Sequence, residues 1–189
     1  MSDLPLPLLI DACVLFPRIP RGLTLMAAEA GLIRPYWSER ILEEWRLSAL
    51  RRGGDDREAR RIIDRMTGRW PDALLEPDRA VELSVHLPDP GDAHVVATAV
   101  GRVPEILTFN LRDFPKRTLA GLGLAARHPD EVFWFLQSVA PGPMTASVRS
   151  LAEELGADDP ADIRRLLKRS LLPRLGKAVE ADGQTFTRP

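Results

Sequence analysis

The sequence has only one cysteine, Cys13, among its 189 residues. A single cysteine excludes an intramolecular disulfide and suits a reducing compartment, so we expect a cytoplasmic protein. No apolar run approaches the roughly 20 residues that span a bilayer, and we expect no membrane association. The N-terminus lacks a basic segment, and Pro5 and Pro7 interrupt its apolar stretch, which argues against a signal peptide.

The sequence also lacks an excess of charge of either sign. It has 26 Lys and Arg against 27 Asp and Glu, a net charge of −1. This balance excludes the simplest argument for nucleic-acid binding, a high overall pI. The basic residues are unevenly spread, because the segment from Arg46 to Arg69 has eight arginines and four acids. Such a patch can hold phosphates or form the solvated face of a helix, and the sequence leaves both interpretations open.

The remaining composition is that of a globular protein, and its order indicates the fold class. Hydrophobic residues make up 44% and charged residues 28%, and the length suits one domain with a short appendage. We expect strands over residues 8–12, 32–37 and 105–110, and helices over residues 22–31, 39–50, 56–69, 92–100 and 128–139. Residues 78–86 fit either a helix or a strand. The alternation predicts an α/β domain with a mostly parallel central sheet over residues 1–140.

The C-terminal part of the chain has a different pattern. Residues 140–144, with two prolines and a glycine, are typical of a linker. Beyond them, leucines such as Leu151, Leu155 and Leu167 recur at helical spacing, and no strand pattern is present. We therefore expect residues 141–189 to form a small, all-helical C-terminal extension of two or three helices.

One acidic residue interrupts the most apolar part of the N-terminal region. Asp11 stands between Leu8–Ile10 and Val14–Phe16, where an ionised, unpaired carboxylate would cost several kcal/mol or more to bury. It follows a predicted strand, and in parallel α/β sheets ligands bind beyond the carboxyl ends of the strands. Other polar residues could reach the same edge of the sheet: Glu44 on the core-facing stripe of a helix, Asp92 at a helix start, Asn110 at a strand end and Asp113 just after it.

Carboxylates brought together raise one another's pKa unless a cation compensates them. Oxygen ligands without an accompanying cysteine or histidine cluster suit Mg²⁺ or Mn²⁺. The sequence therefore predicts a metal site that compensates Asp11. Each of the other acids also has a plainer interpretation, since Asp92 can be an N-cap, Asp113 a turn residue and Glu44 half-exposed on an amphipathic helix.

Four segments, in order, resemble the motifs of PIN-domain ribonucleases. They are "LLIDACVLFP", "SERILEEWRLSAL", "LPDPGDAHVVATAV" and "ILTFNLRDFP", and together they cover about residues 8–115. The matched positions are Asp11, Glu44 (with Glu43 as the alternative), Asp92, and Asn110 with Asp113. The tail of the chain is similar to the helical extension of some VapC-type toxins of toxin–antitoxin pairs.

The resemblance implies a three-layer α/β/α sandwich and an Mg²⁺- or Mn²⁺-dependent endoribonuclease. It implies that Asp11, Glu44, Asp92 and Asp113 hold the metal, with Asn110 and Thr108 in support. It also implies an RNA substrate, a cognate antitoxin partner and a homodimer, for which "VFWFL" at residues 132–136 offers an apolar surface. The arginines expected to contact RNA or antitoxin are Arg46, Arg51, Arg52, Arg57 and Arg61.

Two departures from the family pattern support a second hypothesis. Cys13 stands where members often have Asn or Ser, and Asn110 stands where many have Asp. These residues are compatible with a non-catalytic PIN-fold module that binds RNA or protein through a degraded metal site. A phosphatase that uses Asp11 as nucleophile fits less well, because the Asp-x-Asp pattern of such enzymes would require Asp at position 13.

Overall fold

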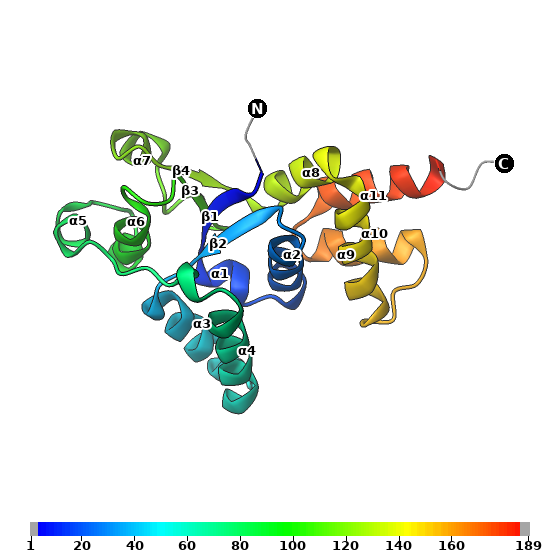
Figure 1. Ribbon diagram of the computed structural model, residues 1–189, viewed down its shortest axis with the longest axis horizontal. Helices are drawn as coiled ribbons and strands as arrows, with labels where there is room; N and C mark the ends of the chain where they lie inside the picture. The colour runs from blue at the N-terminus through cyan, green and yellow to red at the C-terminus, as the bar shows by residue number, and fades with distance from the viewer. Residues whose placement is uncertain (1–3, 186–189) are drawn as a thin grey trace.

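The computed structural model describes residues 4–185, in which four short strands form one parallel sheet. The strands are β1 (Leu6–Ile10), β2 (Ile33–Tyr36), β3 (Glu105–Leu107) and β4 (Ala125–Arg127). Their order across the sheet is β2-β1-β3-β4, so β1 is central and pairs with β2 on one side and β3 on the other. Figure 1 shows this arrangement.

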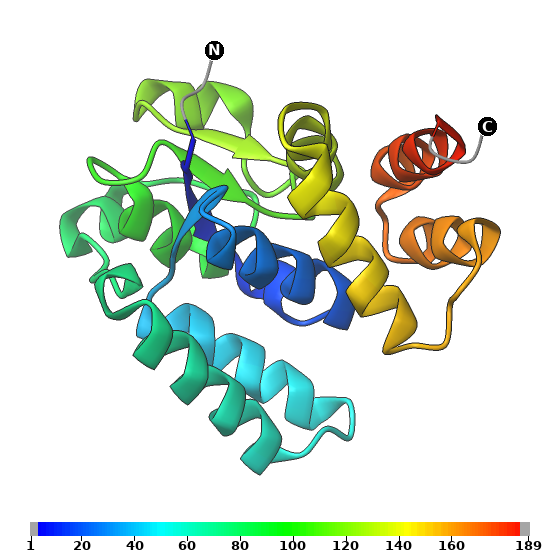
Figure 2. The same cartoon turned by 45° about the vertical axis from the view of Figure 1, so that its right-hand side comes forward.

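Helices connect the strands and continue beyond the last one. The α-helices are α1 (Ala12–Leu15), α2 (Arg18–Glu29), α3 (Glu39–Arg51), α4 (Asp56–Arg69), α5 (Arg79–Ser84), α6 (Ala93–Ala99), α7 (Lys116–Gly121), α8 (Pro129–Val139), α9 (Pro141–Glu153), α10 (Pro160–Arg169) and α11 (Pro173–Thr185). Two 3₁₀ turns, η1 (Pro71–Ala73) and η2 (Pro90–Asp92), complete the described elements. Helices α3 and α4 pack side by side and project away from the sheet (Figures 1 and 2).

The strand order fixes which helices cover which face of the sheet. From β1 the chain moves outward to β2, then passes back across β1 to reach β3. Because parallel crossovers are right-handed, this reversal places α2 on one face and α6 on the other. Helix α2 contacts β2, and α6 contacts β1 and β3. The expected α/β fold with a parallel sheet between helices is confirmed, and the point where the strand order reverses lies between β1 and β3.

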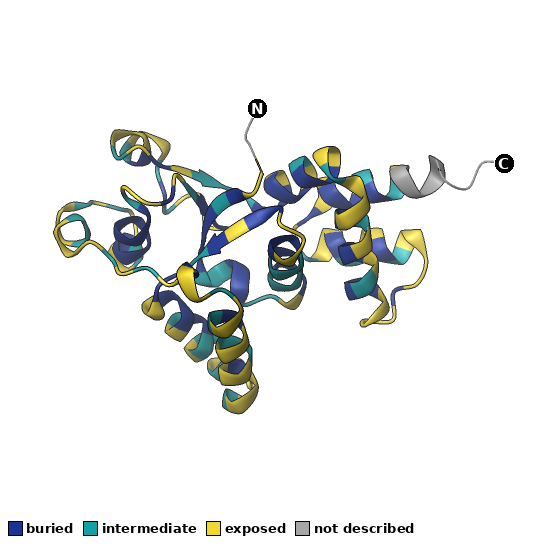
Figure 3. Ribbon diagram, viewed as in Figure 1, coloured by how far each residue is buried: buried dark blue, intermediate teal, exposed yellow. Residues whose placement is uncertain are grey.

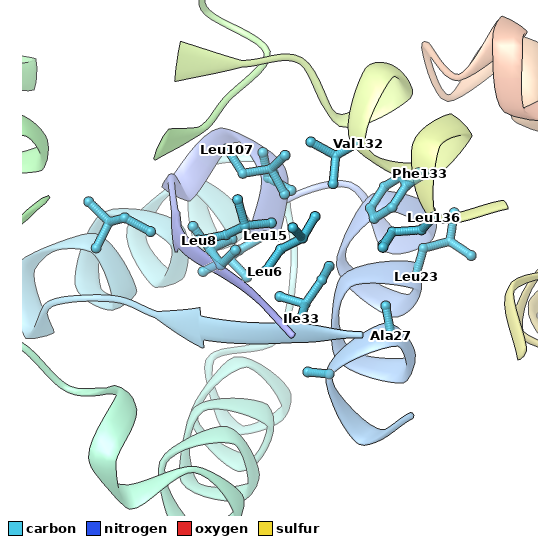
Figure 4. Packing of buried hydrophobic residues seen from close by; sticks show 14 of the residues in the cluster. Leu6, Leu8, Leu15, Leu23, Ala27, Ile33, Leu107, Val132, Phe133 and Leu136 are labelled. Atoms are coloured by element: carbon cyan, nitrogen blue, oxygen red, sulfur yellow. The ribbon is translucent and has the colours of Figure 1, made fainter. Parts of the chain in front are cut away.

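The core forms where the apolar strands meet the apolar sides of these helices. Leu8, Leu9 and Ile10 of β1 are fully buried, and Figure 3 shows how burial concentrates around the sheet. On one face Leu23 of α2 lies beside Phe133 of α8 (Figure 4). On the other, every residue of α6 is buried, which explains its run of small side chains.

Several local features differ from the sequence-based expectation. β1 ends at Ile10, so Asp11 lies just beyond it as the N-cap of α1. The ambiguous residues 78–86 contain helix α5, whereas α1, α7 and β4 were not expected. The predicted linker at 140–144 is wrong, because Pro141 begins α9 directly after α8. Prolines suit the first turn of a helix, whose N–H groups have no intrahelical partner.

Two of the last three helices, α9 and α11, pack against α2 and α8, and α10 packs against α9 and α11. Helix α9 contacts both, and α11 contacts α8. The buried carboxylate of Asp130, on α8, accepts hydrogen bonds from the backbone N–H groups of Arg174 and Leu175 at 3.0 Å, where α11 begins. Arg18 and Glu154 form an ion pair of 2.8 Å between α2 and the end of α9. Among residues 4–185, no helix is long and apolar enough to cross a membrane.

Candidate active site

Asp11 lies at the reversal point of the sheet, and its buried carboxylate is held by neighbouring side chains. The residue is 7% exposed. Thr108, which follows β3, is fully buried and donates from Oγ1 to Asp11 Oδ2 at 2.6 Å. The backbone N–H of Asn110 in turn donates to Thr108 Oγ1 at 3.0 Å. The end of β3 therefore fixes the orientation of the carboxylate that follows β1.

Cys13 contributes to this arrangement in a way that the sequence did not indicate. Its thiol donates to Asp11 Oδ2 at 3.0 Å, and its sulfur accepts the backbone N–H of Phe109 at 3.2 Å. Burial, followed by the negative charge of Asp11, raises the pKa of this thiol far above its usual range. Cys13 is therefore a neutral hydrogen-bond donor to Asp11, not a nucleophile.

Asp92 lines the same cleft, and its carboxyl group is poorly compensated there. It occupies the N-cap position of α6 but caps no backbone N–H, and its buried Oδ2 has no hydrogen-bond partner among the described residues. Burial raises the pKa of Asp92 to about 7, and the negative charges of Asp11, Asp89 and Asp113 add to the effect. The interpretation of Asp92 as only an N-cap does not fit this geometry.

Glu44 lies on the cleft too, but two basic residues, Arg40 and His94, already contact it. Its Oε1 is 3.3 Å from Arg40 Nε and 2.9 Å from Nε2 of the buried His94. The contact with His94 lacks the alignment of a hydrogen bond. Burial acts to raise the pKa of Glu44, but its interactions with His94 and Arg40 outweigh that effect and lower the pKa. Glu44 is therefore ionised and partly compensated.

The other predicted site residues are placed differently. Asn110 lines the cleft, whereas Asp113 does not, although its charge acts on Asp92. The backbone N–H of Asp113 donates to the carbonyl of Asn110 at 3.0 Å in a turn. Asp89, which the sequence analysis did not single out, lines the cleft and accepts the Gly91 N–H at 2.8 Å. Its position in a Pro-rich turn gave no signal beyond that of a turn residue.

The cleft has a volume of about 770 Å³ and combines these acids with arginines from α3 and α10. Arg40 joins Glu44 to Glu82, with 2.8 Å to the latter. Arg51 and Arg52 line the cleft at the end of α3, and the Arg52 guanidinium lies 4.3 Å from the centre of the Phe16 ring. Arg169 reaches the cleft from the end of α10.

The remaining arginines of the basic segment lie outside the cleft. Arg46 bridges α3 and α4 through ion pairs with Glu43 and Asp56, so it joins the two helices. Arg57 and Arg61 are exposed on α4, and Arg61 is 3.7 Å from Glu58. Of the five arginines expected to contact RNA or antitoxin, the structure brings Arg51 and Arg52 to the acids.

The donor set fits a hard divalent cation held mainly by two carboxylates. Within residues 4–185, no group of three or more His, Cys, Asp or Glu side chains is arranged to hold a metal ion. Mg²⁺, however, is often bound through one or two carboxylates, with water and substrate phosphate as the other ligands. Asp11 and Asp92 supply such a pair, and the unpaired Oδ2 of Asp92 is the atom that a cation would satisfy.

Comparison with known proteins identifies one family. The family model of the PIN domain matches residues 8–112, which include Asp11, Glu44, Asp92 and Asn110. No curated protein and no solved structure matches the chain.

Proposed function

Since the chain belongs to the PIN-domain family, a family of nucleases, we propose that it is a divalent-metal-dependent endoribonuclease. The observation that carries the proposal is the state of Asp92. Its Oδ2 is buried without a partner, and its pKa is raised to about 7 by burial and by three neighbouring carboxylates. Such repulsion in a cleft is destabilising unless a cation is bound there.

The residues of the cleft have distinct roles in the proposed reaction. Asp11 and Asp92 would hold Mg²⁺ or Mn²⁺, which would polarise the phosphate that is attacked and lower the pKa of the attacking water. Thr108 and Cys13 keep Asp11 oriented by donating to its Oδ2. Ligand roles for Glu44 and Asp113 remain part of the proposal.

Positive charge is placed where the RNA backbone would run. Arg51 and Arg52 line the cleft at the end of α3, two helical turns, about 10 Å, beyond Glu44. We propose that they hold phosphates next to the one that is hydrolysed. We also propose that the protein is the toxin of a toxin–antitoxin pair, with a protein antitoxin as partner and a homodimer as its assembly. In the 132–136 stretch only Trp134 is exposed, so a dimer through this stretch would be centred on that side chain.

The direct test is cleavage of a structured RNA with Mg²⁺, with Mn²⁺ and with EDTA. We expect cleavage with either metal, none with EDTA, and a loss of at least about a hundredfold in Asp11→Asn and Asp92→Asn. Asp64→Asn is the matched control, because Asp64 is exposed on α4 outside the cleft. Cleavage that survives EDTA or Asp11→Asn would contradict the proposal.

The alternative, a non-catalytic RNA- or protein-binding module, is favoured by one observation. Arg40 and His94 already contact Glu44 Oε1, so that this oxygen is less available to a metal ion. For such a module, RNA binding in the absence of cleavage with both metals is the expected result. Asp92→Asn would then leave RNA affinity unchanged or increase it, because one negative charge is lost from the cleft.

A further inference from the structure

The C-terminal helices form part of the wall of the candidate active-site cleft. Arg169, Ser170 and Leu171, at the corner between α10 and α11, line the same cleft as Asp11 and Asp92. This corner lies far beyond residue 112, where the family match ends. The contribution of the corner is therefore specific to this chain's extension.

Leu171 has a backbone conformation that its side chain does not favour. Its φ is +61°, and among residues 4–185 it is the one non-glycine residue with positive φ. It follows the last turn of α10, where the N–H of Leu172 donates to the Leu167 carbonyl at 2.9 Å and the N–H of Leu171 to the Lys168 carbonyl at 3.2 Å. Helices that end with these two bonds usually have glycine at this position.

A leucine at such a position needs an explanation other than local structure. The side chain of Leu171 does not fill the core, since the residue is 58% exposed. It lies instead on the cleft. An unfavourable backbone conformation that places an apolar side chain at a binding cleft is a reason to propose a role in binding.

The charges of the cleft indicate which ligand would reach this corner. Arg40 is ion-paired, whereas Arg51, Arg52 and Arg169 have no acidic partner among the described residues. The cleft thus combines carboxylates that suit a metal ion with arginines free to bind anions. A strand of RNA satisfies both, because one phosphate can bind the metal while others bind arginine. An acidic protein segment would satisfy the arginines alone.

We propose that the α10–α11 corner is a substrate-binding element, in which Arg169 holds a backbone phosphate of single-stranded RNA and Leu171 packs against an adjacent base. The proposal rests on the proposed endoribonuclease function and adds a second wall to its substrate site. Arg51 and Arg52 hold the strand from α3, and Arg169 holds it from the opposite wall. The extension thereby determines how the RNA strand lies across Asp11 and Asp92.

RNA binding tests this role separately from cleavage. Each variant is made in the full chain carrying Asp11→Asn, and its affinity for a fluorescently labelled single-stranded RNA of mixed sequence is measured by anisotropy. We expect Arg169→Gln to bind about five- to tenfold more weakly and to reduce the salt dependence by about one phosphate contact. Lys168→Gln is the matched control, because it removes the same charge from the neighbouring exposed position outside the cleft.

A second variant separates binding from folding. Leu171→Gly suits the positive φ, so we expect a melting temperature equal to or above that of the parent, with RNA affinity about threefold lower. In chains with Asp11 intact, Arg169→Gln should raise KM for RNA cleavage more than it lowers kcat, since the proposal has Arg169 hold a phosphate other than the reacting one.

The outcomes distinguish this proposal from the proposed function. Equal RNA affinity of Arg169→Gln and Lys168→Gln overturns the role of the corner, even when the wild-type chain cleaves RNA. The absence of any RNA binding also overturns it. So does a result in which Arg169→Gln weakens binding only to an acidic polyglutamate probe, which would assign the corner to a protein partner. If RNA binding depends on Arg169 but no metal supports cleavage, the corner binds RNA and the nuclease activity is refuted.

Discussion

Replacing Asp92 by Asn should stabilise the metal-free protein at neutral and alkaline pH. The pKa of Asp92 is raised to about 7 in the folded state by burial and by Asp11, Asp89 and Asp113, whereas an aspartate in an unfolded chain titrates near about 4. The folded state therefore favours the neutral carboxyl. The stability that Asp92 contributes is fully present below about pH 4 and is lost as pH rises to about 7.

The size of the effect follows from the difference between the two pKa values. About three units at about 1.4 kcal/mol each give a ceiling of about 4 kcal/mol. Asp92 is only partly buried, so solvent screening reduces the expected gain of Asp92→Asn to about 1–3 kcal/mol at pH 8. For a chain of this length that corresponds to a rise of about 3–10 °C in the melting temperature.

The assay is thermal unfolding of wild type, Asp92→Asn and the exposed control Asp64→Asn between pH 4 and 8 in EDTA. The wild type and the control should lose stability over this range by more than Asp92→Asn does. Excess Mg²⁺ should then stabilise the wild type more than Asp92→Asn and narrow the difference in stability between them, because Asp92→Asn has lost one of the two carboxylates. Parallel stability curves in EDTA would refute the reasoning.

Two further substitutions test the supports of the site and of the extension. Thr108→Val removes the donor to Asp11 Oδ2 while keeping the shape of the side chain; we expect about 1–2 kcal/mol lower stability and about tenfold lower cleavage. The loss of cleavage is checked by measuring the cleavage rate as a function of Mg²⁺ concentration. A Mg²⁺ requirement equal to that of the wild type would contradict the supporting role of Thr108. Asp130→Ala leaves the N–H groups of Arg174 and Leu175 without their acceptor, at a cost of about 2–3 kcal/mol. Limited proteolysis should then cut the C-terminal helices first, whereas Asp130→Asn, which keeps one acceptor oxygen, should be cut more slowly.

The sequence predicted the parts of the fold that depend on local patterns. Ser38, directly before the helix expected over residues 39–50, caps α3 with its Oγ accepting the Ile41 N–H at 3.3 Å, and the small-residue run of α6 is a buried helix. β4 could not be predicted in this way, because its three residues form a strand only by pairing with β3. The first turn of α9 has the composition of a linker, because proline and glycine give the same signal at a helix start as in a loop.

In the candidate site, too, the sequence indicates features that depend on local patterns but not those that depend on distant segments. Asp11 was evident because a charge in an apolar stretch is conspicuous even without a structure. The partners that decide how each acid behaves come from distant segments: Thr108 for Asp11, His94 for Glu44 and Asp89 for Asp92. For Arg169, no local sequence pattern indicates a place in the site. Its place beside the acids follows only from the packing of α9 and α11 against α2 and α8.

The corner at Arg169 and Leu171 also has a consequence for the order of events during synthesis. The cleft takes Asp11 from the end of β1 and Leu171 from beyond the region that the PIN-domain model matches. A chain still attached to the ribosome can therefore form the sheet and the carboxylate pair before the second wall has emerged. If the second wall positions RNA, the nascent protein has no complete substrate site until residue 171 has been synthesised.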